Sequence, residues 1–589
     1  MRIVAIDFEG DAGDRGLTAM SLYSDQGEWY STNVSDMEHK LHELAREEIR
    51  FIAHNAEYDC IVGFSQLGCD VRFIFNNGRF NHAEIKATGW PKIVHCWDTM
   101  ILSGGLSVAK LGKAIGKPKY PTPPSLLNTQ TLVPPWRCDR HNKLHCVECY
   151  AVRDAEIIYD FYAQYAGFLS TYGLEPKRTL ASAAVDLWRV LDNVGQCNIT
   201  SKRIDDFCRL SYHGGRTEVF KYGTISSVYT ADVTSMYPYV MRQMAYPKMD
   251  TLLYNDSKLL NESILRFEGV SEADVQLPYH HVPCLPVEHE GKLYFPYGKL
   301  HGIWTNVELR YAKQKGAIIN RIYRTVYSPK TCFPFQTFVD VLYTLRAEYK
   351  KADDPRQLTV KILLNALYGR LGLSREQERE TIISLPPYAS SEDYQGYYLE
   401  LIKGRAYARK EQHFSGASKY SNVLWASYIT AYARLKLQYY LESQGNNVIY
   451  CDTDSIYSQA PIETEGDGLG ALGKPEYWDK GTFLGPKLYR LEMYGGNTLL
   501  RAKGVPQSVA ADYLRTGAAT FQAPFRVREA LAQGETAGRW REVTKHQHLV
   551  PSKRQLVYPD WLESGMLYSD TNPVFFEPNA ESEEEVQDE

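Results

Sequence analysis

Two aspartates, two positions apart, interrupt an otherwise apolar stretch that runs from Asn446 to Ala460, NNVIYCDTDSIYSQA. Its flanks are rich in β-branched and aromatic residues, which predicts half-buried strands. Burying Asp452 is costly, and a second carboxylate at Asp454 raises that cost because like charges disfavour ionisation. The stretch therefore predicts one of two structures: a site where something positive balances both acids, or a turn at the surface.

The composition is that of a large globular chain. Its 589 residues, 44% of them hydrophobic, predict three to five modules at roughly 150 residues per domain. No stretch approaches the ~18 apolar residues of a membrane span, and the start, MRIVAIDFEGD, does not read as a signal peptide. Eleven cysteines, scattered and odd in number, do not suggest a disulfide framework. We therefore expect a cytoplasmic monomer without a membrane partner.

The charge is unevenly distributed along the chain. The net charge is −5, but the stretch from Glu577 to Glu589 alone carries seven acids and no base. The remainder is slightly basic, and the segment from Arg310 to Arg370 holds twelve Lys and Arg against four Asp and Glu. The net charge therefore does not exclude a nucleic-acid partner.

Two further stretches carry chemically useful side chains. In SSVYTADVTSMYPYV, Asp232 ends a strand-like run just before a turn, and hard oxygen ligands suit Mg²⁺. In RQLTVKILLNALYGRLG, Lys361, Asn365 and Tyr368 share one helical face, which suits a nucleoside triphosphate. Taken singly, such an aspartate is more often a turn cap and such a lysine more often solvated surface.

Taken together and in this order, DVTSMYP, KILLNALYG and YCDTDS resemble motifs A, B and C of the family B DNA polymerases. The resemblance implies a right-hand polymerase whose palm holds two Mg²⁺ (or Mn²⁺) ions on Asp232 and Asp454, with Asp452 as a supporting carboxylate. Those ions would activate the primer 3′-hydroxyl and stabilise the leaving pyrophosphate. The implied partners are a DNA template-primer and deoxynucleoside triphosphates.

The same resemblance assigns the nucleotide site. Lys361 would hold the incoming phosphates, and Tyr237 would lie under the sugar, where its ring leaves no room for a 2′-hydroxyl. Ala366 departs from the family, which usually has Ser at this position. The nucleotide-binding residues it implies are Ser235, Met236, Tyr237, Lys361, Asn365 and Tyr368.

The N-terminal stretches AIDFEG, HNAEYD and YAVRD resemble the three motifs of the tyrosine variant of DEDD-type 3′–5′ exonucleases. This predicts an RNase H-like domain with a second two-metal site, in which Tyr150 would orient the attacking water. The metal ligands it implies are Asp7, Glu9, Asp59 and Asp154. LSVAKLG is similar to the single-strand-binding motif, so the residues expected to bind DNA here are Asn55, Tyr58, Ser107 and Leu111.

Two more matches point to the protein-primed phage and plasmid polymerases, and so to a bacterial host cytoplasm. YHGGR resembles their YxGG motif, and PKLYRLE resembles their KxY motif. The DNA-binding residues implied are Tyr212, Gly214, Gly215, Lys487 and Tyr489, with Lys503 nearby. The spacing between Asp232 and Lys361 leaves room for an insertion of the kind that holds a terminal protein.

The fold expected is therefore α/β and α+β multidomain. Its order is a 3′–5′ exonuclease domain (1–175), a linker and palm start (176–243), a terminal-protein-region-like insertion (244–336), fingers (337–376), a second insertion that assists strand displacement (377–415), the remaining palm (416–509), a thumb placed by position only (510–575) and a disordered acidic tail (576–589).

Two sequence features lie outside that resemblance. CDRHNKLHCVEC has C-x2-H-x4-C-x2-C spacing, so Cys138, His141, Cys146 and Cys149 form either a compact structural zinc site or four unligated, reduced side chains. GLGALGKP matches most of a P-loop, but Pro475 replaces the hydroxyl that Mg²⁺ needs, so a plain loop is expected.

Three alternatives to a protein-primed polymerase remain. One is a family B polymerase that extends ordinary primers only, and another is an inactive relative that binds DNA as a scaffold. A glycosidase-type acid pair would also explain two close carboxylates. The last does not account for the Lys-Asn-Tyr helix, and the presence of all the acids and of Lys361 speaks against the scaffold.

Overall fold

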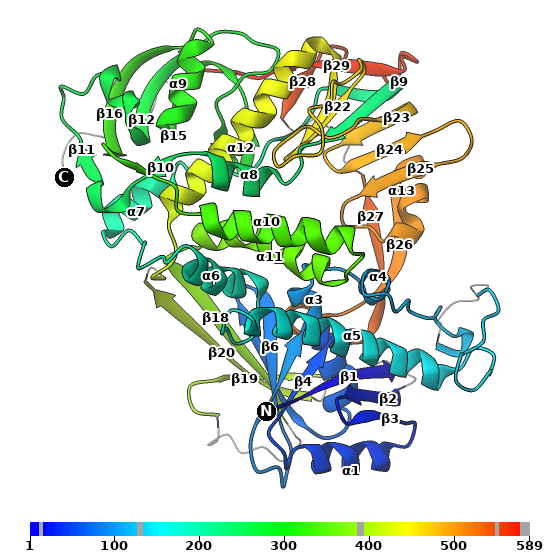
Figure 1. The fold of residues 1–589 in the computed structure, drawn as a ribbon. Coiled ribbons are helices and arrows are strands. Elements are labelled where there is room, and N and C mark those ends of the chain that lie inside the picture. The colour runs from blue at the N-terminus through cyan, green and yellow to red at the C-terminus, as the bar shows by residue number, and fades with distance from the viewer. Residues whose placement is uncertain are drawn as a thin grey trace.

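The computed structural model describes residues 1–10, 16–126, 133–385, 394–403, 405–416, 418–547 and 553–577. Three sheets organise this part of the chain: an N-terminal sheet, a central sheet and an insertion sheet. In Figure 1 two long green helices, α10 (Gln336–Lys351) and α11 (Arg356–Leu371), lie between the N-terminal sheet below and the central sheet above. No helix in the described ranges is long and apolar enough to cross a membrane.

The N-terminal sheet has ten strands, and β1 pairs in parallel with β4, which pairs in parallel with β7. Its strands, in spatial order, are β19 (Tyr398–Ile402), β20 (Arg405–Ser415), β18 (Glu376–Leu385), β5 (Asp70–Asn76), β6 (Arg79–Lys86), β7 (Val94–Asp98), β4 (Ile49–Ala53), β1 (Arg2–Gly10), β2 (Leu17–Ser24) and β3 (Gly27–Ser31). The helices of this part are α1 (Val34–Leu44), α2 (Ala56–Asp59), α3 (Thr99–Leu102), α4 (Val108–Ala114) and α5 (Val147–Ser170).

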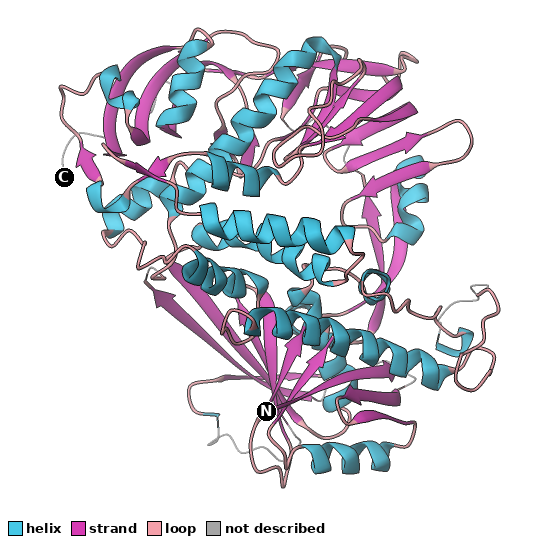
Figure 2. Cartoon of the chain, viewed as in Figure 1, coloured by secondary structure: helices cyan, strands magenta, loops and turns pink. Residues whose placement is uncertain are grey.

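Helix α5 crosses one face of this sheet, as Figure 2 shows. It buries an apolar face that includes Ile157, Ile158 and Phe161, which are at most 1% exposed. These residues belong to one core cluster that continues through α6 (Leu180–Leu191), α11 and α12 (Val423–Gln444). The shared core fixes the N-terminal sheet relative to the rest of the chain.

The central sheet is antiparallel throughout. Its main path is β25 (Thr498–Ala502), β24 (Leu488–Glu492), β23 (Glu476–Gly485), β9 (Lys221–Asp232), β22 (Ser455–Ser458), β21 (Val448–Asp452) and β8 (Thr217–Val219), with β29 (Tyr568–Pro573) on β9 and β28 (Arg554–Leu556) on β29. Helices α7 (Lys202–Arg209) and α8 (Met236–Gln243) both contact α12.

The insertion sheet follows α8 in the chain. Its strands are β11 (Leu253–Asn255), β16 (Ile318–Ser328), β12 (Glu268–Leu277), β15 (Tyr297–Thr305) and β30 (Phe575–Phe576), with α9 (Asn306–Gln314) packed on β12 and β15. Two small ladders accompany it, β13 (Val287–His289) with β14 (Lys292–Tyr294) and β10 (Tyr246–Pro247) with β17 (Thr331–Cys332). A capping box on Thr305 and Glu308 starts α9.

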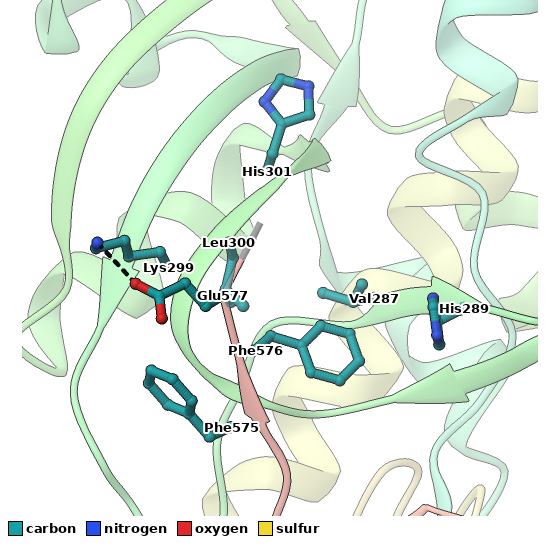
Figure 3. A pocket seen from close by; sticks show the side chains of 8 residues that line it. All are labelled: Val287, His289, Lys299, Leu300, His301, Phe575, Phe576 and Glu577. Atoms are coloured by element: carbon teal, nitrogen blue, oxygen red, sulfur yellow. Dashed lines mark hydrogen bonds and ion pairs between the residues drawn. The ribbon is translucent and has the colours of Figure 1, made fainter. Parts of the chain in front are cut away.

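The last described strand, β30, pairs in parallel with β15 and closes a cavity of about 420 Å³ on the insertion sheet. Figure 3 shows Phe576 and Val287 side by side in this cavity, and Lys299 paired with Glu577 at 2.9 Å. The cavity lies on the insertion sheet and contains none of the predicted catalytic residues.

Three features of the structure depart from what local periodicity indicates. The segment expected to form the fingers is two helices, because Asp353 adopts a positive φ of 50° and Pro355 follows. Strands β18 to β20, in the predicted second insertion, extend the N-terminal sheet through a ladder between β18 and β5. Both are pairings or breaks that local periodicity does not show.

The third departure is at the C-terminal end. Within the predicted thumb, β26 (Ala518–Pro524) and β27 (Trp540–His546) form their own ladder beside α13 (Ala510–Thr516) and α14 (Val527–Gln533), but β28 and β29 belong to the central sheet. The range 510–575 therefore contributes strands to two separate sheets. Phe576, the first residue of the predicted tail, lies in β30, and 578–589 lie outside the described residues.

Candidate active sites

The two strands that carry the predicted catalytic acids of the central sheet are neighbours. Asp232 is the last residue of β9 and pairs in register with Ser455, the first residue of β22. The Val233 N–H donates to the Asp454 carbonyl oxygen at 2.8 Å. Thr453 has a positive φ of 63° in the tight turn between β21 and β22. The two acids therefore meet where both strands end.

The two acids of the doublet have different surroundings. Asp452 accepts hydrogen bonds from the hydroxyls of Thr217 at 3.0 Å and Tyr450 at 3.2 Å, and Lys487 Nζ lies 3.2 Å from its Oδ2. Burial, followed by the charge of Asp232, raises the pKa of Asp454 to about 6. Protein donors thus balance the negative charge of Asp452, whereas the surroundings of Asp454 leave its carboxylate suited to bind a cation.

Asp232 itself is open to solvent at the end of its strand. Desolvation of the carboxylate, followed by the charges of Glu476 and Asp452, raises the pKa of Asp232. The charge of Arg501 lowers it. Glu476 and Arg501 were not found from the sequence, because each lies on a separate strand of the central sheet and has no motif around it. A divalent cation would relieve the repulsion among these carboxylates, so the acids fit the predicted metal site.

The helix with the Lys-Asn-Tyr face is α11. Lys361 and Asn365 are exposed, and the Asn365 amide donates to the Lys361 carbonyl oxygen at 2.9 Å. Tyr368 is half-buried, and its ring stacks on Tyr237 of α8. On the adjacent helix α10, Arg346 donates to the Ser235 hydroxyl at 3.1 Å. Arg346 is a cation at this site that the sequence reasoning missed, because it is one of several bases on an amphipathic helix.

The YHGGR loop joins several of these parts. A Cβ on Gly215 would lie 3.0 Å from Thr453 and 3.2 Å from the Tyr237 hydroxyl. Arg434 of α12 donates to the carbonyl oxygens of His213 at 2.6 Å and Gly214 at 2.8 Å. Gly215 thus permits a close approach of the loop to the acid-bearing turn.

The loop is also tied to the insertion and to α11. Arg434 pairs with Glu308 of α9 at 2.7 Å, and both side chains are at most 2% exposed. The ring of Tyr212 lies against Gly372, where a Cβ would come within 2.5 Å of it. The YHGGR loop is therefore packed against α12, the insertion and the end of α11.

The GLGALG stretch is a loop, as expected, and it packs on the strand end that carries Asp232. The Gly473 N–H donates to the Asp232 carbonyl oxygen at 3.0 Å, and the Gly470 N–H donates to the Thr234 carbonyl oxygen at 2.8 Å. A Cβ on Gly470 would meet the Tyr239 ring at 2.0 Å. These glycines serve packing rather than phosphate binding.

A second acid cluster lies on the N-terminal sheet. Asp7 and Glu9 are on β1, Asp59 ends α2 and Asp154 is in the second turn of α5. Burial, then the charges of Glu9, Asp154 and Asp59, raise the pKa of Asp7. Burial and the charge of Asp154 raise the pKa of Glu9 to about 7. Because these carboxylates raise one another's pKa values, all four lie in one site.

This cluster has the polar character of a cation site. Asp7 Oδ2 and Asp154 Oδ1 are buried oxygens with no hydrogen-bond partner, an arrangement that is costly unless a cation completes it. Lys119 bonds to the Asp154 carboxylate, and its Nζ lies 4.5 Å from the centre of the Tyr150 ring. Lys119 was missed because it lies in a proline-rich loop without periodicity.

The predicted DNA-binding residues near this cluster are mostly held by backbone contacts. The Asn55 N–H donates to Asp98 at 2.9 Å, with a positive φ of 71°, and the Tyr58 hydroxyl donates to the Gly10 carbonyl oxygen at 2.8 Å. The Ser107 hydroxyl caps α4. Thr122 lies 3.3 Å from the Tyr150 hydroxyl, which fixes that hydroxyl beside the acids.

Three predicted contact residues are placed differently from the expectation. Leu111 is fully buried in the core, and Met236 is 1% exposed in the cluster under the central sheet, so both side chains are covered by the protein itself. Tyr489 is 5% exposed, with its hydroxyl 2.7 Å from that of Tyr457. Hydrophobic residues within these motifs serve packing. Lys487 and Lys503 are exposed, joined by a backbone hydrogen bond of 3.1 Å.

The structure also brings the Cys/His quartet together. One ligand atom from each of Cys138, His141, Cys146 and Cys149 lies within 4.8 Å of the others. All eleven cysteines are free thiols.

The chain has an RNase H-like N-terminal domain joined to a hand of palm, fingers and thumb. This combination of domains defines the class of DNA polymerases that carry a nuclease-type domain. Residues 151–459 match the family described as DNA polymerase type B, organellar and viral. The chain belongs to this family.

Relatives and solved structures agree with this membership. The DNA-directed DNA polymerase of Enterobacteria phage PRD1 is 30% identical over 311 residues, covering 51% of this chain and 52% of that protein. A probable DNA polymerase of Neurospora intermedia is 26% identical, covering 54% and 35%. The match thus spans about a third to a half of these curated relatives.

The fold is also that of Phi29 DNA polymerase complexed with primer-template DNA, with a TM-score of 0.68, 15% identity and coverage of 93% of this chain and 100% of that one.

Proposed function

We propose that this protein is a DNA-directed DNA polymerase that adds deoxynucleotides to a primer 3′ end and removes nucleotides from it at a second, 3′–5′ exonuclease site. The observation that carries the proposal is the meeting of Asp232 and Asp454 at paired strand ends. Family membership and the exposed Lys361 on α11 support it. A scaffold without catalysis would have no use for acids kept at raised pKa values.

In the polymerase site Asp232 and Asp454 would hold two Mg²⁺ or Mn²⁺ ions, which supply the positive charge that in-line displacement at phosphorus requires. Asp452 positions Lys487 beside the site through their 3.2 Å ion pair. Lys361 would neutralise the incoming phosphates, with Arg346 on the neighbouring helix as a second cation. Tyr237 would exclude a 2′-hydroxyl, because its ring is fixed by the stack on Tyr368.

In the exonuclease site Asp7, Glu9, Asp59 and Asp154 would hold the cations, and Tyr150 would orient a water. Lys119 limits the net negative charge there through its bond to Asp154. It also holds the Tyr150 ring, over which its ammonium lies. The DNA strand would run past Asn55, Tyr58 and Ser107.

The finer part of the proposal concerns priming. The insertion sheet with α9 has the sequence position of a region that holds a terminal protein, and the PRD1 and phi29 polymerases are among the relatives. We propose that a terminal protein supplies the first hydroxyl, in the reducing cytoplasm that eleven free thiols suit. An enzyme that extends ordinary primers only is the second candidate.

Two experiments separate these proposals. Primer extension with Mg²⁺ tests polymerisation, and its absence in the wild type contradicts the main proposal. Incubating the enzyme and a labelled deoxynucleotide with the protein encoded beside it tests priming. Covalent label on that protein supports priming by protein, whereas extension of DNA primers with no labelled protein favours the second candidate.

A further inference from the structure

A short hairpin and the start of α5, which follows it, together carry four side chains of the types that bind metals. Cys138 and His141 lie in its turn, Cys146 is the N-cap of α5, and Cys149 is in the first turn of that helix. Figure 1 shows this segment as the cyan loop that projects beside the start of α5. The three thiols are 3 to 7% exposed, whereas His141 lies at the surface of the cluster.

The distances within the quartet fit a tetrahedral zinc ion. His141 Nδ1 lies 3.4 Å from Cys149 Sγ and 3.7 Å from Cys146 Sγ. Zinc bonds of about 2.3 Å to sulfur and about 2.0 Å to nitrogen place two such ligands about 3.6 Å apart at a tetrahedral angle. All four ligand atoms lie within 4.8 Å of one another, and three thiolates with one imidazole leave no position open for a substrate.

The backbone of the hairpin is shaped around the same point. The His141 N–H donates to Cys138 Sγ at 3.4 Å, so the backbone turn closes on that sulfur. Asn142 and His145 adopt positive φ angles of 49° and 48°, and Arg137 bridges to Leu144. The turn therefore contains two residues in a strained backbone conformation.

Besides an ion pair of Arg140 with Glu28 and a hydrogen bond of 2.8 Å from the Tyr120 hydroxyl to Asp139, the hairpin is held by a small apolar cluster. Its apolar cluster consists of three cysteines, with Tyr120 and Trp136 stacked at 4.8 Å beside them. So small a cluster is a poor core, and short segments of this kind usually need a metal or a disulfide. A second group with suitable spacing, His82, Glu84 and His95, is unsuited to a cation, because the guanidinium of Arg178 lies 2.8 Å from His82 Nε2.

We propose that Cys138, His141, Cys146 and Cys149 bind one structural Zn²⁺. This ion fixes the start of α5, the helix that carries Tyr150 immediately after Cys149 and Asp154 one turn further on. The ion therefore sets the position of the tyrosine and one acid of the N-terminal site through the helix that carries them, without contacting substrate. This consequence for DNA degradation rests on the proposed function, whereas zinc binding does not.

The first test is metal content. The full chain, purified under reducing conditions without a metal-affinity resin, is expected to contain about one zinc per chain by mass spectrometry of the metals. Cys138→Ser and Cys149→Ser are expected to lose most of it, and Cys332→Ser, a matched change at a free cysteine beside β10, is expected to keep it. Wild-type protein with less than about 0.2 zinc per chain, or with an oxidised pair among these thiols, overturns the proposal even if the variants fail to fold.

The second test separates the site from its consequence. Replacing zinc by Co²⁺ in the wild type is expected to give the visible absorption of a tetrahedral cobalt–thiolate centre. Removing zinc with a selective chelator and assaying in excess Mg²⁺ is expected to slow degradation of single-stranded DNA about 10- to 100-fold, with primer extension changed less than about twofold. Equal loss of both activities, or of neither, overturns the positioning role. If the wild type degrades no DNA at all, the proposed function fails while the cobalt spectrum still decides the metal site.

Discussion

The rings of Tyr237 and Tyr368 stack with their centroids 4.1 Å apart and their planes 7° from parallel. One ring is on α8, directly after the strand that ends in Asp232, and the other is on the exposed-lysine face of α11. Burial, followed by the nearby Tyr368, raises the pKa of Tyr237 far above its ordinary value. The contact joins the acid-bearing sheet to the helix expected to meet the triphosphate, so the proposed sugar site would have a rigid floor.

Replacing Tyr237 by Ala should relax the choice between sugars. Without the ring, a 2′-hydroxyl fits, so ribonucleotide incorporation relative to deoxynucleotide incorporation should rise at least about tenfold. Single-nucleotide insertion kinetics with both sugars measure this ratio. Tyr239→Ala, on the same helix but packed on Gly470, is the control. Unchanged discrimination in the Tyr237 variant would refute the assignment of the sugar site.

Gly372→Ala should loosen the contact between α11 and the YHGGR loop. A Cβ there comes within 2.5 Å of the Tyr212 ring, whereas at Gly369 of the same helix it meets nothing within 4 Å. We expect a loss of about 1–3 kcal/mol in the free energy of unfolding for Gly372→Ala. Gly369→Ala should gain up to about 1 kcal/mol. Urea denaturation measures both, and the loss should shrink when Tyr212 is also changed to Ala.

Arg434→Leu should be severely destabilising. It leaves the Glu308 carboxylate, 1% exposed, without its partner and removes the donors of two loop carbonyl groups. The expected cost is about 3–5 kcal/mol, measured by denaturant unfolding. The exposed pair of Lys202 and Asp206 is the comparison, and Lys202→Leu should cost less than about 1 kcal/mol. A double change to Leu at 434 and 308 that recovers nothing would contradict this account.

The two sites should differ in their response to acid. The pKa of Glu9 is raised to about 7, chiefly by burial, and that of Asp454 to about 6. A protonated carboxyl does not hold a cation, so as the pH falls the Mg²⁺ needed for half-maximal DNA degradation should rise first, between about pH 8 and 7. The Mg²⁺ needed for primer extension should rise mainly below about pH 6. Parallel increases in both requirements would contradict these environments.

Much of the catalytic geometry was predictable from the sequence because it is local. A tight turn between two apolar strands fixes Asp452 and Asp454 relative to each other, and the helical spacing fixes Lys361 beside Asn365. The family resemblance and the fold were likewise confirmed. Asp7 and Glu9 lie on one side of β1 because side chains alternate along a strand.

What could not be predicted depends on contacts between distant segments. Lys119, Arg346, Glu476 and Arg501 reach the acid clusters only through the tertiary fold. The ladder between β18 and β5 joins residues roughly 300 positions apart, and no local pattern encodes such a pairing. The burial of hydrophobic motif positions such as Leu111 and Met236 could not be predicted either, because a motif does not distinguish packing from binding.

The most direct test of the whole account crosses the two acid clusters. Asp454→Asn keeps the shape of the side chain and removes its charge. Asp7→Ala removes the charge of one acid in the N-terminal site. In assays with Mg²⁺, the first variant should lose primer extension by at least about a hundredfold and keep degradation of single-stranded DNA, and the second should show the reverse. Normal extension by Asp454→Asn would contradict the assignment of the central sheet as the site of DNA synthesis.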